Sequence, residues 1–91
     1  MHYIYILHSK KDKGLYIGLT TDLKRRVAEH KRGSVTSTKH RLPIQLIHYE
    51  AFLVEKDAKA RERYLKSGYG RQQLKDSLKR LFKKLNIKEK I

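Results

Sequence analysis

Two short apolar runs on either side of a polar loop constrain how the first third of this chain can fold. Residues 3–8, YIYILH, and residues 15–20, LYIGLT, are rich in aromatic and β-branched side chains, which favour β-strands. The intervening segment, SKKDKG, is polar and ends in glycine, as turns often do. The pattern predicts a β-hairpin that places Tyr5 and Tyr16 on neighbouring strands.

A helix and a loop are predicted after the hairpin. Residues 20–22, TTD, are good N-cap residues, and Gly33 is typical of the position that follows a helix end. Between them, Leu23 and Val27 are spaced as the buried stripe of a short helix. Residues 34–43 lack periodicity and contain several turn formers, so they predict a loop.

The second half of the chain adds a strand and two helices. Residues 44–52 are predicted as a third strand, and residues 55–68 as a helix closed by glycine. A basic amphipathic helix is predicted at about 70–86, with an apolar stripe formed by Leu74, Leu78, Leu81, Phe82 and Leu85. The order ββαβαα predicts one small α+β domain over residues 1–91, in which a three-stranded antiparallel sheet is flanked by three helices.

Positive charge dominates the composition. The 91 residues include 23 Lys and Arg against 9 Asp and Glu, a formal net charge of +14. So much charge on a short chain causes self-repulsion and favours a polyanionic partner, with nucleic acid as the first class to consider. No stretch approaches the roughly 20 apolar residues of a membrane span. The N-terminus also lacks the order of a signal peptide, so we expect an unprocessed cytoplasmic protein without a membrane partner.

Several kinds of site are excluded by the residues present. Cysteine is absent, which rules out disulfides, thiolate metal ligands and a cysteine nucleophile. The five histidines are scattered without ligand spacing, so a structural zinc site is not expected. The chain also lacks a Ser/His/Asp order, a phosphate loop and a dinucleotide-binding glycine pattern.

The first predicted helix carries a polar row beside its apolar stripe. Asp22, Arg26 and His30 are four residues apart and therefore share a face. Arg25 points elsewhere and suits a contact with phosphate. The spacing alone also fits a solvated basic helix with an Asp22–Arg26 ion pair.

The next predicted helix carries a carboxylate on its apolar face. Ala58, Glu62 and Leu65 are spaced four and three apart, so Glu62 falls on the side turned inward. A buried carboxylate without a partner is costly. The spacing leaves two alternatives open, an ion pair with Lys66 or a neighbouring arginine, and a divalent metal ion.

Taken singly, the tyrosines of the hairpin fit ordinary strand packing, but the residues taken together resemble the GIY-YIG nuclease superfamily. The resemblance rests on YIY at 3–5, YIG at 16–18, Arg26, His30 and the helix around Glu62, in the family's order and spacing. In particular, the chain resembles small stand-alone members similar to the nuclease module of the excinuclease C protein. The resemblance covers nearly the whole chain.

The resemblance implies a metal-dependent endonuclease that hydrolyses phosphodiester bonds. Tyr5 and Tyr16 match the motif tyrosines that position or deprotonate the attacking water. Arg26 matches the catalytic arginine, and Glu62 matches the glutamate that holds one Mg²⁺ or Mn²⁺ ion. A fixed guanidinium and a divalent ion suit this reaction because negative charge develops on the phosphate oxygens.

Two further positions match the family pattern, and one departs from it. His30 matches a frequent active-site histidine, and Gly18 matches the motif glycine beside the cleft. Tyr3 stands where the first motif of many relatives has glycine.

The expected partner is nucleic acid, DNA rather than RNA, bound through phosphate and shape contacts. The resemblance covers no added specificity domain, and no helix groups Asn, Gln and Arg for reading base edges. The basic residues expected to contact the backbone are Arg25, Lys31, Arg71, Lys75, Lys79, Arg80, Lys83 and Lys84. We therefore expect a structure-recognising or weakly sequence-specific endonuclease of DNA repair or recombination.

Two other functions compete with an endonuclease. The chain can be a basic nucleic-acid-binding module that keeps a nuclease-like scaffold without turnover, in which case Glu62→Ala would leave its affinity unchanged. It can also be an RNA-associated accessory protein, which explains the charge but not the inward position of Glu62.

Overall fold

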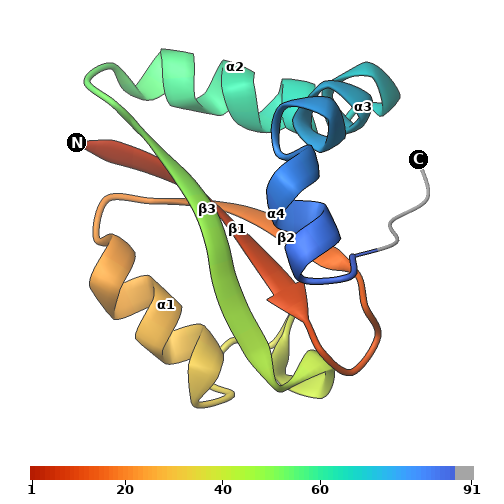
Figure 1. Cartoon of the computed structure of the whole chain (residues 1–91). Helices are drawn as coiled ribbons and strands as arrows, with labels where there is room; N and C mark the ends of the chain where they lie inside the picture. Colours follow the sequence, from red (N-terminus) through yellow and green to blue (C-terminus); the bar gives the residue numbers. More distant parts are fainter. Residues whose placement is uncertain (88–91) are drawn as a thin grey trace.

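The sheet consists of three antiparallel strands, β1 (His2–Ser9), β2 (Leu15–Thr20) and β3 (Ile44–Phe52). The computed structural model describes residues 1–87, so the last four residues of the predicted domain lie outside the described residues. The strand order is β2-β1-β3, which places β1 in the centre with hydrogen bonds on both sides. The predicted hairpin and the predicted α+β class are therefore confirmed (Figure 1).

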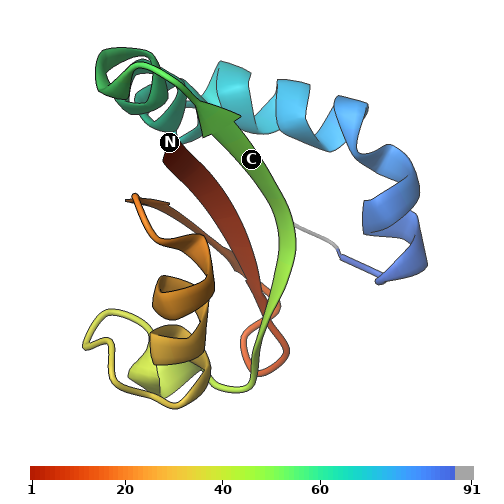
Figure 2. The same cartoon turned by 90° about the vertical axis from the view of Figure 1, so that its left-hand side faces the viewer.

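The helices lie on both faces of this sheet. In the described part of the chain they are α1 (Leu23–Lys31), the 3-10 turn η1 (Lys39–Arg41), α2 (Glu55–Leu65), α3 (Gly68–Ser77) and α4 (Lys79–Lys84). Figure 2 shows the sheet between α1 on one side and α2, α3 and α4 on the other. No helix within residues 1–87 is long and apolar enough to cross a membrane.

The alternation of side chains along β1 creates two separate cores. The larger cluster lies under α2, α3 and α4 and contains Ile4, Ile6, Leu15, Ile17, Ala58, Leu65, Leu74, Phe82 and Ile87. Each fully buried side chain of this kind contributes about 1.5–3 kcal/mol relative to an exposed one. The smaller cluster, around Tyr5, Leu7 and Ile44, lies on the α1 face. Stability thus comes mainly from one face of the sheet.

The prediction of one continuous helix at about 70–86 is wrong, because the structure has two helices there. The chain forms α3 from Gly68, capped by the Ser67 side chain, and then α4, with Leu78 as the junction at φ −110° and ψ 24°. The Ser77 hydroxyl donates to the Leu74 carbonyl at 3.1 Å, a local bond that bends helices. A straight helix of this length would extend about 25 Å. The break instead turns the chain so that Phe82 returns to the core that holds Leu74.

His8 on the central strand is an unusual member of the interior. Its side chain is buried, and neither ring nitrogen has a hydrogen-bond partner within residues 1–87. Burial lowers the pKa of His8 below its ordinary value of 6.5, and the charge of Lys13 lowers this pKa further. The unfolded chain therefore binds a proton at His8 more readily than the folded chain does.

We predict that His8→Leu raises the free energy of unfolding by about 1 kcal/mol at neutral pH, because it removes a buried polar group without a partner. The variant should also lose less stability on acidification. A depressed folded pKa contributes stability above the unfolded value of 6.5, and this contribution falls as the pH drops below that value. Urea unfolding at about pH 7.5 and about pH 5 measures both effects. An identical pH dependence in the variant and the wild type would contradict the prediction, and His40→Leu, at an exposed histidine, is the control.

Candidate active site

A chain of three hydrogen-bonded polar side chains lies under α1. The Tyr5 hydroxyl is 2.8 Å from Nε2 of His30, and Nδ1 of His30 is 2.7 Å from Oγ1 of Thr38. All three side chains are almost completely buried, with exposed fractions of 1%, 0% and 0%. Burial, together with the nearby charge of Arg26, lowers the pKa of His30 below its usual range. The imidazole is therefore neutral at physiological pH, and donates from one nitrogen while it accepts at the other.

Local sequence explains how α1 brings His30 to this position. Asp22 caps the helix, and its carboxylate accepts the backbone N–H of Arg25 at 3.1 Å. Leu23 and Val27 pack toward the sheet, and His30 continues their stripe at the next helical turn. The helix ends before Gly33, whose φ of +80° is accessible to glycine at little cost. The predicted extent of this helix is confirmed.

Gly18 makes room for the Tyr5 ring. The two residues are directly paired across β1 and β2. A β-carbon at position 18 would lie 2.3 Å from both Cζ and the hydroxyl oxygen of Tyr5. Only glycine at position 18 therefore leaves room for the buried tyrosine ring beside β2.

Tyr16 lies at the open side of the same cluster. Its ring centroid is 5.2 Å from that of His30 and 6.3 Å from that of Tyr5. In contrast to Tyr5, it is only partly buried, and the Ser37 hydroxyl approaches its hydroxyl at 3.5 Å. Of the two motif tyrosines, Tyr16 is thus the one a substrate can reach directly.

Arg26 stands beside the tyrosine cluster with its side chain 37% exposed. Burial raises the pKa of Tyr5 above its ordinary value, and the neighbouring Arg26 guanidinium partly offsets this rise. Arg26 forms an ion pair with Glu29, from Nη1 to Oε1 at 3.1 Å, rather than with Asp22. The Asp22–Arg26 pair that the spacing allowed is therefore absent, because Asp22 serves as the helix cap.

Glu62 projects from α2, which belongs to the opposite layer of the structure. Its side chain is 22% exposed, and Oε2 accepts from Nζ of Lys66 at 3.3 Å, which is the first of the two alternatives that the spacing left open. Within residues 1–87 no hydrogen bond or ion pair joins Glu62 to Tyr5, Tyr16 or Arg26. The structure thus brings the two tyrosines, Arg26 and His30 together, while the contact it shows for the Glu62 carboxylate is the ion pair with Lys66.

The donor set around Glu62 fits only a weakly coordinated hard cation. No group of three or more His, Cys, Asp or Glu side chains within the described residues could enclose a metal ion. Mg²⁺ is commonly held by one or two carboxylates and completes its shell with water and substrate phosphates. One partly exposed carboxylate fits such an open site, but not a closed one.

The predicted phosphate-binding residues occupy two different surfaces. Arg25 and Lys31 are exposed on α1, and Lys75 and Lys79 are exposed on α3 and α4, across the sheet. Arg71 is half-buried, and this burial lowers its pKa. The predicted phosphate contacts are therefore divided between the α1 surface and the α3–α4 surface.

Sequence reasoning missed Thr38. It lies in the segment predicted only as a loop, where its N–H donates to the Val35 carbonyl at 3.1 Å in a turn that carries its side chain under α1. The segment has no periodicity that would indicate burial, so no signal in the sequence distinguishes Thr38 from its neighbours.

Comparison with known proteins gives consistent matches. The profile of the GIY-YIG catalytic domain matches residues 1–76. A UPF0213 protein of Haloquadratum walsbyi is 45% identical over 67 residues, which cover 72% of this chain and 74% of the relative. A UPF0213 protein of Clostridium perfringens is 34% identical and covers 100% of this chain and 98% of its own length. The solution NMR structure of a UPF0213 protein from Bacillus halodurans is 37% identical over 80% of each chain, with a TM-score of 0.51.

We predict that Gly18→Ala lowers the free energy of unfolding by about 1–3 kcal/mol, because the added methyl group overlaps the buried ring of Tyr5. The displaced ring should also lose its hydrogen bond to His30, which the ¹⁵N chemical shifts of the imidazole report. Gly68→Ala is the matched control, since no atom lies within 4 Å of its added β-carbon. Equal stability of the two variants would contradict the proposed packing of Tyr5.

Proposed function

Since the chain belongs to the GIY-YIG family, we propose that it is a metal-dependent endonuclease that hydrolyses phosphodiester bonds in DNA, in repair or recombination. The observation that carries this proposal is the buried chain of Tyr5, His30 and Thr38 beside the partly exposed Tyr16 and Arg26. A small domain gains little stability from burying polar groups, even when they are fully hydrogen-bonded. Their presence is better explained by proton transfer at the edge of a phosphate site.

The proposed proton path runs inward from Tyr16. In this path Tyr16 contacts the attacking water. Its hydroxyl lies close enough to Tyr5 to raise the pKa of the Tyr5 hydroxyl. This path uses the neutral tautomer with its proton on Nδ1, in which Nε2 of His30 accepts from the Tyr5 hydroxyl and Nδ1 donates to Oγ1 of Thr38. As the water oxygen bonds to phosphorus, its proton passes to the Tyr16 oxygen while Tyr16 gives its own proton to Tyr5 and Tyr5 gives its own to Nε2 of His30. The bond between phosphorus and the leaving oxygen breaks, and the leaving oxygen takes a proton from solvent.

Two positive groups would neutralise the negative charge of the phosphate, the Arg26 guanidinium and a divalent cation. The guanidinium of Arg26 is fixed by Glu29 and lies beside the tyrosines, where it neutralises a phosphate oxygen. Glu62 would hold Mg²⁺ or Mn²⁺, which supplies further neutralisation of the phosphate when bound. For that role the carboxylate must exchange its contact with Lys66 for the cation.

One observation favours a second function, a nucleic-acid-binding module without turnover. Glu62 is engaged by Lys66, and within the described part of the chain no hydrogen bond or ion pair joins it to the other motif residues. In that case the ion pair is structural and the positive charge alone accounts for binding.

We predict that Arg26→Ala and Glu62→Gln each lower the cleavage rate about 100-fold or more while leaving the melting temperature and nonspecific binding nearly unchanged. The assay uses supercoiled, branched and single-stranded DNA and RNA, with Mg²⁺, with Mn²⁺ and with a chelator. Arg63→Ala and Glu55→Gln are the controls, since both side chains are exposed on α2. Wild-type rates in either site variant would refute the site, and binding without cleavage by any of the proteins would favour the binding module.

We also predict that Thr38→Val lowers the cleavage rate about tenfold or more, because His30 loses the partner that sets its orientation and tautomer. Thr38→Ser keeps the hydroxyl and should restore most of the rate. The Thr38→Val melting temperature separates this effect from unfolding. If the valine and serine variants were equally slow, the hydroxyl would have no part in catalysis.

A further inference from the structure

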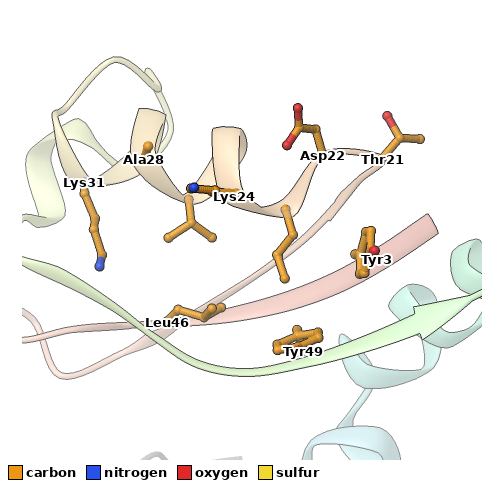
Figure 3. A pocket seen from close by; sticks show the side chains of 10 residues that line it. Tyr3, Thr21, Asp22, Lys24, Ala28, Lys31, Leu46 and Tyr49 are labelled. Atoms are coloured by element: carbon orange, nitrogen blue, oxygen red, sulfur yellow. The ribbon is translucent and has the colours of Figure 1, made fainter. Parts of the chain in front are cut away.

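We propose that a groove between α1 and β3 binds an unpaired nucleotide of a single-stranded nucleic acid. The groove lies on the side of α1 away from the tyrosine cluster and has a volume of about 610 Å³. Figure 3 shows Tyr3 and Tyr49 on the strands at one end of it, and Lys24 and Lys31 on the helix above it. The proposal deepens the proposed function, on which it rests for the identification of the bound strand as substrate.

The two tyrosines offer the groove an aromatic surface. Their ring centroids are 6.3 Å apart with an interplanar angle of 62°, an edge-to-face pair. Tyr49 is 53% exposed, although it lies on a strand whose other large apolar side chains are at least partly buried. An exposed aromatic face on a rigid strand is a stacking platform for a base of any sequence.

The helix side of the groove is basic and leaves space for the backbone of a single-stranded nucleic acid. Lys24, Ala28 and Lys31 follow one another at intervals of four and three, so they form one row along α1. The two lysines are separated by about 10 Å along the helix axis, and the small Ala28 side chain lies between them. Among residues 1–87 neither lysine takes part in an ion pair within 4 Å, so both charges remain available to phosphates.

Asp22 is the only carboxylate that lines the groove within the described residues, and the two lysines Lys24 and Lys31 outnumber it. Asp22 accepts the backbone N–H of Arg25 and is the cap of α1. The net character of the lining is therefore aromatic and positive, which complements a base and its flanking phosphates.

The position of the tyrosines favours an unpaired nucleotide over a duplex. Bases inside a duplex are stacked on one another and present only their edges, whereas stacking on a protein ring requires a free base face. Tyr3 and Tyr49 lie at the floor of the groove, below the helix (Figure 3). A base of a single-stranded nucleic acid can stack on these rings while its phosphates stay near Lys24 and Lys31.

The test measures binding of labelled oligothymidylate, oligouridylate and a hairpin duplex by fluorescence anisotropy, in chelator so that no cleavage occurs. Tyr49→Ala should weaken binding of both single strands about tenfold and leave duplex binding unchanged. Tyr49→Phe should bind as the wild type does, since stacking needs only the ring. Tyr69→Ala, at a tyrosine 88% exposed on α3, is the matched control and should have no effect.

The lysine row gives a second readout. The Lys24→Ala, Lys31→Ala double variant should reduce the slope of log affinity against log salt by about 1 to 2, and the Lys10→Ala, Lys11→Ala double variant in the hairpin loop should not. The proposal would be overturned if Tyr49→Ala weakened the binding of single strand and duplex equally, or if it weakened neither. Loss of a self-associated species in Tyr49→Ala on analytical ultracentrifugation would overturn it in favour of a second copy as the occupant. Because cleavage plays no part in these measurements, an inactive site would leave them unaffected.

Discussion

The close approach of the Tyr5 ring to Gly18 is the contact on which the candidate site depends. The ring occupies the space where any other residue at position 18 would carry a β-carbon. In that space the tyrosine is buried under α1, and its hydroxyl reaches the imidazole of His30. The hydrogen-bonded chain continues from there to Thr38. The absence of one methyl group on β2 thus determines where three polar side chains meet.

One face of the sheet carries most of the apolar core, and the other carries the candidate active site. A chain of this size can build only a small core, and most of it lies under α2, α3 and α4. Because that face supplies most of the apolar burial, the α1 face can hold polar groups in its interior. They are tolerated there because Tyr5, His30 and Thr38 satisfy one another, whereas His8 on the same central strand has no such partner within the described residues.

Local chemistry predicts most of this architecture. The hairpin and α1 follow from periodicity that can be read directly, whereas the grouping of Tyr5, Tyr16, Arg26 and His30 is what the resemblance to GIY-YIG nucleases implies. Thr38 was not predictable, because its burial results from tertiary packing of a loop without a pattern. The junction at Leu78 was not predictable either. The apolar stripe continues through it at helical spacing, whereas the turn itself brings Phe82 into the tertiary core that also holds Leu74.

The helix α1 separates the candidate active site from the proposed groove, and this limits the path of a bound strand. Arg26 and His30 face the tyrosines, while Lys24 and Lys31 face β3. A strand that occupies both sites must cross one end of the helix. At the N-terminal end it meets the carboxylate of Asp22, a full negative charge that outweighs the helix dipole of roughly half a positive charge. At the C-terminal end it meets the basic residues 31–32. Electrostatics therefore favours a path around the C-terminal end of α1, past the loop that supplies Thr38.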